Sequence, residues 1–273
     1  MELKIPLVIT VLATIFAILT PWLVAKLIPQ AANWNWTAAS AIFTAAMTGA
    51  TMWMAVEARA NRLEAIKAGK RQAFKSALVE ITHRNQVVVG ILKGLSAKGK
   101  LIREFLTGDV QSGIEYLRDY PKTVELLQQV NVPADTFRYV LGAVHKMKGL
   151  VNSIEEEIGK AFQIKGDSIN VTLRRFKYLH LILVQLGRVL VVEAKKQGIE
   201  EIQEWEELLK PSFFAGDLGT DDVSQAIAVY PPLGELRLPP GKEYERLSFP
   251  ELVKEAKNEK PESVDSVLGI REV

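Results

Sequence analysis

Residues 37–56 read TAASAIFTAAMTGATMWMAV, twenty consecutive residues without a charged side chain. A helix of about 20 predominantly apolar residues is long enough to cross the hydrocarbon core of a bilayer. Trp34 and Trp36 precede this stretch and Trp53 lies near its far end, an arrangement typical of aromatic side chains at the two membrane interfaces. The stretch therefore predicts a membrane-spanning helix.

A second uncharged stretch, residues 5–25, comes just before it, with Lys26 close to its end. Extended to residue 28 it has a helical length of roughly 36 Å, against about 30 Å of hydrocarbon. The link over residues 29–36 is short, so the two spans are expected to form an antiparallel hairpin. The alternative is a cleaved signal peptide, with Lys4 as its charged start and Ala31-Ala32 beyond its apolar region.

Basic residues follow the second span directly, whereas the link between the spans offers only Lys26. By the positive-inside rule this places both termini in the cytoplasm, with the hairpin in the inner (cytoplasmic) membrane. The same side chains are expected to contact anionic lipids: Arg59, Arg62, Lys67, Lys70, Arg71 and Lys75. Nucleic-acid binding would need interleaved aromatic residues, and only Phe74 is present, so it is not expected.

Small residues recur every four positions in the second span, at Ala41, Ala45 and Gly49. They form one groove, and small residues allow close helix packing in lipid. Three interpretations remain open: the groove receives the first span, it joins copies of the chain into a homo-oligomer, or the neighbouring hydroxyls line a pore. Those hydroxyls belong to Ser40, Thr44, Thr48 and Thr51, and they can also bond to their own helix.

The predicted fold class is all-α, with three parts: a transmembrane hairpin (1–57), a cytoplasmic helical bundle (58–210) and a Pro-rich acidic tail (211–273). The second span should continue as one helix to about residue 95, fraying at Gly90 and Gly94, because no proline occurs between Pro29 and Pro121. Further helices are expected over residues 100–107, 111–119, 121–130, 133–163, 168–197 and 199–210. In the tail a single helix is predicted at 248–258, opened by a capping box of Ser248 and Glu251.

The helix over residues 168–197 contains the nearly apolar stretch 179–192, too short and too polar for a third span. It predicts the central helix of the bundle. Arg188 lies inside this stretch and needs a carboxylate or a ligand anion, and an internal ion pair is expected. His145 and His180 are expected to be hydrogen-bonded packing residues. The short helix after it should bury Ile202, Trp205, Leu208 and Leu209.

The sequence contains no recognisable catalytic, cofactor or metal site. It has no cysteine, and no two of its three histidines lie within five residues of each other. Residues 94–101 match the spacing of a phosphate-binding loop, but Leu101 stands where a metal-ligating Ser or Thr is needed, so a turn between helices is the preferred interpretation. The carboxylate runs at 155–157 and 200–207 are interpreted as solvated helix faces.

The layout of two spans, a basic helix containing ALVEITHRN at residues 77–85, and a bundle of long helices resembles a class of bacterial two-span membrane proteins of unknown function. Some of that class are suspected of acting in phage defence. The resemblance covers residues 1–195 and rests on this layout and on the pattern Ala-Leu-x-Glu-Ile-x-x-x-Asn. It implies a membrane-anchored helical protein and transfers no functional residue.

Two functions follow from these expectations. The first is a non-enzymatic, membrane-anchored oligomer whose bundle binds a partner or senses a signal, and whose spans hold that partner at the membrane or change membrane permeability. The alternative is a passive scaffold whose acidic tail docks a soluble partner. Residues 199–273 carry a net charge of −9 and residues 58–103 carry +9, so the tail and the basic segment are also expected to meet.

Overall fold

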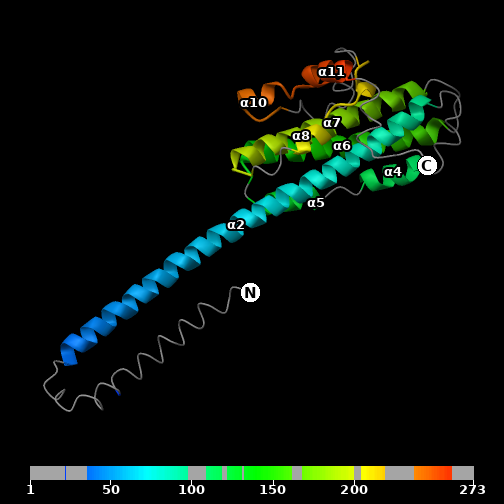
Figure 1. The fold of residues 1–273 in the computed structure, drawn as a ribbon. Helices are drawn as coiled ribbons and strands as arrows, with labels where there is room; N and C mark the ends of the chain where they lie inside the picture. Colours follow the sequence, from blue (N-terminus) through cyan, green and yellow to red (C-terminus); the bar gives the residue numbers. More distant parts are fainter. Residues whose placement is uncertain are drawn as a thin grey trace, which may run out of the picture. The chain divides into compact units, whose positions relative to one another are not determined.

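The computed structural model of the chain describes residues 22, 36–97, 109–118, 122–130, 132–161, 168–199, 204–218 and 237–259. Within these residues every regular element is a helix, which confirms the all-α fold class (Figure 1). The first predicted span lies outside the described residues apart from Trp22, as does the predicted helix at 100–107. The chain divides into two compact units, Met1–Glu64 and Ala65–Val273. The three predicted parts stay a prediction.

The helix predicted from about residue 37 to about residue 95 is α2, Trp36–Ala97. It has 62 residues and passes through Gly90 and Gly94, so the predicted fraying at these glycines was wrong. In the part of the chain described, no helix is both long enough and apolar enough to cross a membrane. The two-span hairpin accordingly stays a prediction.

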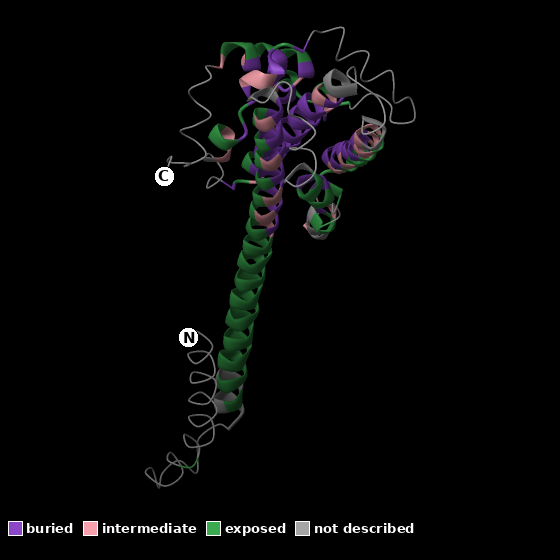
Figure 2. Cartoon of the chain, turned by 90° about the vertical axis from the view of Figure 1, so that its right-hand side faces the viewer, coloured by how far each residue is buried: buried purple, intermediate pink, exposed green. Residues whose placement is uncertain are grey.

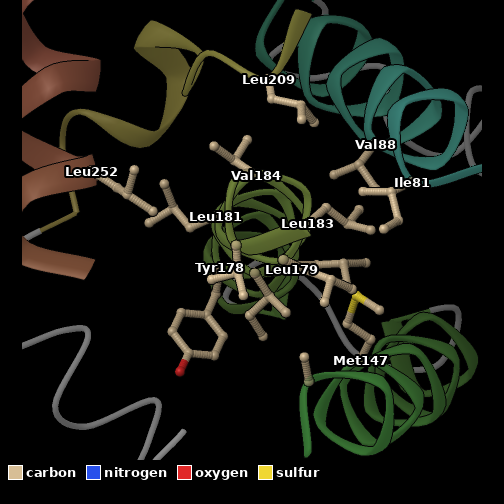
Figure 3. Close-up of a cluster of buried hydrophobic side chains, with 14 of the residues drawn as sticks. Ile81, Val88, Met147, Tyr178, Leu179, Leu181, Leu183, Val184, Leu209 and Leu252 are labelled. Carbon is tan, nitrogen blue, oxygen red and sulfur yellow. The ribbon is translucent and has the colours of Figure 1, made fainter. Parts of the chain in front are cut away.

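The next four helices described in the second unit begin and end close to their predicted limits. They are α4 (Asp109–Arg118), α5 (Lys122–Gln129), α6 (Ala134–Ala161) and α7 (Ser168–Lys196). In α7 every residue from Phe176 to Ala194 is buried except Arg188, which confirms α7 as the central helix. Its side chains point outward to α2, to α6 and to the segments around Leu209 and Leu252 (Figure 3).

The end of α7 is built on Gly198, whose φ of 74° is readily reached only by glycine. Gly198 N–H donates to the Lys195 carbonyl at 2.9 Å, and Ile199 N–H donates to the Ala194 carbonyl at 3.0 Å. This pair of bonds is the Schellman arrangement that commonly terminates a helix. The predicted end at residue 197 is thereby confirmed to within one residue.

Only part of the helix predicted over residues 199–210 lies among the described residues. The expected helix over 199–210 is represented by α8, Glu204–Leu208. Of the predicted buried face, Leu209 is buried and Trp205 is half-buried. Leu208 is 39% exposed, so its assignment to the buried face was wrong. Ile202 lies outside the described residues.

The described residues of the tail form three short elements where one helix was predicted: η3 (Phe213–Ala215), α10 (Lys242–Glu245) and α11 (Phe249–Asn258). Ser248 is the N-cap of α11, as expected, but its side chain makes no capping hydrogen bond, so the capping box was wrong. Gly216 permits the close packing of η3 and α11, because a Cβ there would lie 2.9 Å from the Lys257 backbone nitrogen.

Candidate functional site

The most unusual surface of the described chain is the exposed part of α2. Every residue from Phe43 to Gly69 is exposed, and burial begins only at Ala73 (Figure 2). The residues to Val56 carry no charge, and large apolar side chains are among the exposed ones: Phe43, Met47, Met52, Trp53, Met54 and Val56. Apolar surface of this kind marks a site of contact with a membrane or another protein.

The hydroxyl groups on this part of α2 bond to their own helix. The Oγ1 atoms of Thr44, Thr48 and Thr51 each donate to the backbone carbonyl four residues earlier, at 2.8 Å. A hydroxyl satisfied in this way can be placed in an apolar environment without losing a hydrogen bond. This bonding was one of the predicted alternatives, and it favours a packing role for the threonines over a pore lining.

The predicted helix-packing groove is open among the described residues. Ala45 and Gly49 are exposed, and a Cβ built on Gly49 meets no atom within 4 Å. The side chain of Ala41 lies outside the described set. What occupies the groove stays a prediction.

The basic residues after the uncharged segment are mostly solvent-accessible. Arg59 and Arg62 in the first unit are exposed, as are Lys67, Arg71 and Lys75 in the second, while Lys70 is half-buried. Exposure is what contact with lipid headgroups requires, and that contact also stays a prediction. Among the described residues, carboxylates of the acidic segment 199–273 pair with basic residues of α7, through Lys177–Asp217, Arg188–Glu255, Lys195–Glu206 and Lys196–Glu243. The predicted meeting of this segment with the basic residues of 58–103 stays a prediction.

Arg188 confirms the predicted internal ion pair. Its Nη1 and Nη2 donate to the two carboxylate oxygens of Glu255 at 2.6 and 2.5 Å, and its Nε donates to the Leu209 carbonyl at 2.9 Å. The bidentate geometry joins the central helix to α11 and to the residue after α8. A guanidinium among apolar side chains is stable only with such partners.

His180 is completely buried and holds three segments together, as predicted for a hydrogen-bonded packing residue. The Ser212 backbone N–H donates to His180 Nε2 at 2.7 Å, so the proton lies on Nδ1, which donates to Asn85 Oδ1 at 2.6 Å. Burial lowers the pKa of His180 to about 4. His145, by contrast, is exposed, so its predicted packing role was wrong.

The His180 network predicts a loss of stability in mild acid. In the unfolded chain the imidazole titrates at its ordinary pKa of 6.5, but in the folded chain only at about 4. The unfolded state therefore binds the extra proton as the pH falls below 6.5, and stability drops by about 2–3 kcal/mol between pH 7 and pH 4.5. Urea unfolding at the two pH values measures this loss.

Two variants isolate the contribution of His180 from that of titrating carboxylates. His180→Gln removes the titrating group, so its unfolding free energy should change with pH by about 2 kcal/mol less than that of the native chain. His145→Gln alters an exposed histidine and should retain the native dependence. Equal pH dependence in all three proteins would contradict the assignment.

A buried cation, Arg84, was missed by the sequence interpretation. It donates to the Glu80 carboxylate at 2.9 Å and to the carbonyls of Tyr116 and Leu117, at 2.9 and 3.2 Å, at the C-terminal end of α4. It thereby satisfies backbone groups that a helix end leaves without internal partners. The only available signal was its place one turn after Glu80 in the stretch 77–85.

The carboxylate run at 155–157 was interpreted as a solvated face, and the structure corrects this. Glu155 pairs with Arg118, and Glu157 accepts from Arg175 Nη1 at 2.8 Å. These pairs tie α6 to α4 and α7, so the interpretation was wrong for Glu155 and Glu157, whereas Glu156 is exposed as expected. Among the residues that the structure describes, no group of three His, Cys, Asp or Glu is arranged to hold a metal ion.

The structure describes the first four residues of the near-match to a phosphate-binding loop. Residues 94–97 are the last turn of α2, and the apolar residues 87–89 before them are helical. The strand that a phosphate-binding loop follows is therefore absent at this position, where the chain is described up to residue 97. This agrees with the preferred interpretation of a connection between helices.

Comparison with known proteins found no family model, no curated protein and no solved structure that matches this chain.

Proposed function

We propose that this chain is a non-enzymatic membrane protein that self-associates through the uncharged part of α2 and presents its helical bundle to a partner or signal in the cytoplasm. The observation that supports it most is the exposed, uncharged surface over residues 43–56, whose threonine hydroxyls bond inward. Water is a poor solvent for such a surface, and a bilayer or a second apolar helix covers it without an unsatisfied polar group.

In this proposal residues 5–25 and 37–56 form a hairpin in the inner membrane, with both termini in the cytoplasm. The basic side chains from Arg59 to Lys75 lie at the cytoplasmic surface and contact anionic lipid headgroups. The bundle then receives the partner, and the spans hold it at the membrane or alter membrane permeability, as in a bacterial defence or stress system. No cofactor or catalytic residue takes part.

The alternative, a passive scaffold that docks a soluble partner through its acidic tail, is less well supported. Asp217, Glu243 and Glu255 of the tail already pair with basic residues of α7. A partner that recognised these carboxylates would have to replace contacts within the bundle. The proposal therefore places the interaction elsewhere.

Self-association through the groove predicts that Gly49→Leu weakens the oligomer. A leucine side chain prevents the close approach that Ala45 and Gly49 allow, and a tenfold loss of association is the expected order of magnitude. Amine-reactive crosslinking of the full chain in isolated membranes measures this. Gly69→Leu is the matched control, because Gly69 is also an exposed glycine of α2 at which an added Cβ would meet no atom within 4 Å.

The two variants make the same chemical change on the same helix, so general effects on helix stability cancel. Reduced crosslinking of Gly49→Leu with native crosslinking of Gly69→Leu supports the proposal. Native crosslinking of both variants would mean that copies do not associate through this groove.

A further inference from the structure

A cleft of about 520 Å³ lies in the second unit and is formed by three separate stretches of the chain. Arg188 and Val192 come from α7, and Lys210 follows α8. Arg246, Leu247 and Lys254 come from the segment that contains α10 and α11. A volume of this size is within the range of clefts that bind small molecules, roughly 300–1,000 Å³.

One cation that lines the cleft, Arg188, is already bound by other groups of the protein. The guanidinium of Arg188 donates from all three nitrogens to groups of the bundle, two to Glu255 and one to the Leu209 carbonyl. Glu206, which also lines the cleft, accepts from Lys195 Nζ at 2.7 Å. These groups fix the shape of the cleft and are not available to a ligand.

Three further cations of the cleft are weakly engaged. The Arg246 side chain is exposed, and its guanidinium has no hydrogen bond or ion pair with any described residue. Lys210 and Lys254 pair with carboxylates three residues away, Glu207 at 3.9 Å and Glu251 at 4.0 Å. Exposed pairs at such distances are weak and are readily exchanged for another anion.

We propose that this cleft binds a small organic anion, a phosphate or carboxylate compound that also carries hydroxyl or amino groups. The Arg246 guanidinium offers a planar set of donors that matches either anion, and the two lysines add point charges. Val192 and Leu247 supply an apolar surface for the body of the ligand. Glu207 and Glu251 accept hydrogen bonds from its hydroxyl or amino groups.

Such a ligand contacts α7, the end of α8 and the α10–α11 segment at once. Binding therefore stabilises the docking of the tail on the central helix, because the cleft exists only when these segments are together. The inference deepens the proposed role of the bundle as the part that receives a signal. The signalling role of the ligand rests on the proposed function. The cleft itself does not, because none of its lining residues lies in 37–56.

The test is thermal unfolding of the purified full chain with three probes: AMP, glutamate and inorganic phosphate. A site occupied at 100 times its Kd should raise Tm by roughly 5–10 °C. We expect AMP to do so if the ligand is an organic phosphate, glutamate to do so if it is a carboxylate, and inorganic phosphate to have little effect. Arg246→Glu should abolish the rise.

Arg237→Glu is the matched control, because Arg237 is an exposed arginine of the same segment that does not line the cleft. It should respond like the native chain, and both variants should have a native Tm without a probe. Three results overturn the inference: no rise with AMP or glutamate, a rise retained by Arg246→Glu, or a rise that inorganic phosphate reproduces in full. A failure here leaves the crosslinking at Gly49 unaffected, so the two proposals are tested separately.

Discussion

Phe74→Ala is expected to lower the free energy of unfolding of the second unit by about 3–5 kcal/mol, the usual cost of removing a fully buried phenylalanine. Phe74 has no exposed surface and belongs to the core cluster that surrounds α7. At about 2–4 °C for each kcal/mol, Tm should fall by on the order of 10 °C. Thermal unfolding of the detergent-solubilised full chain provides the measurement.

Phe43→Ala is the control on the same helix. Phe43 is 44% exposed and lies in the first unit, so its truncation should change the Tm of the second unit by less than about 2 °C. If Phe43→Ala destabilised the second unit as much as Phe74→Ala, the division of α2 into an exposed part and a core part would be wrong.

Arg188→Met is expected to have the next largest effect, a loss of about 2–4 kcal/mol. The substitution leaves the Glu255 carboxylate and the Leu209 carbonyl without their donor. The loss is below the cost of a fully buried charge, because the Glu255 side chain keeps 38% of its exposure and can be hydrated. Urea unfolding of the full chain measures it.

The pair itself is tested by adding Glu255→Leu. If the orphaned carboxylate causes much of the loss, the double variant should be more stable than Arg188→Met alone. Lys254→Met, one residue away, breaks only an exposed pair at 4.0 Å and should cost less than about 1 kcal/mol. An Arg188→Met protein as stable as Lys254→Met would show that the ion pair contributes nothing.

The long helices could be predicted from the sequence because their signals are local and repeated. The run without proline between Pro29 and Pro121 led to α2, and the apolar stretches of α6 and α7 led to those helices, each ending within about two residues of its predicted limit. Such a signal is repeated over many turns, so a single misleading residue such as Gly90 does not change the assignment.

The short elements could not be predicted in the same way. α10 has four residues, and neither its length nor its composition makes a helix stable alone. It is held by Tyr244, whose hydroxyl donates to the buried Glu193 at 3.2 Å, a residue 51 positions earlier. A contact of that sequence separation leaves no periodic signal.

Some charged contacts could be predicted from a local sequence signal, and others could not. An arginine inside the apolar stretch 179–192 required a partner, so the existence of the Arg188 pair could be predicted, but the choice of Glu255 depended on where α11 docks. For Glu155 and Arg118, which are 37 residues apart, nothing local indicated a pair, and the solvated-face interpretation was wrong for that reason.

The central claim, that the uncharged part of α2 is embedded in a membrane, is tested most directly by cysteine accessibility. The chain contains no cysteine, so a single cysteine can be introduced without background. Met47→Cys places it in the uncharged part, and Gln72→Cys places it on the same helix among the basic residues that follow; both native side chains are exposed. Inside-out membrane vesicles are then treated with a water-soluble maleimide.

Rapid labelling is expected of Gln72→Cys, and labelling of Met47→Cys should be at least about tenfold slower until detergent dissolves the membrane, because the thiolate that reacts does not form in hydrocarbon. Labelling of both cysteines at the same rate in intact vesicles would contradict it, since residue 47 would then be in water.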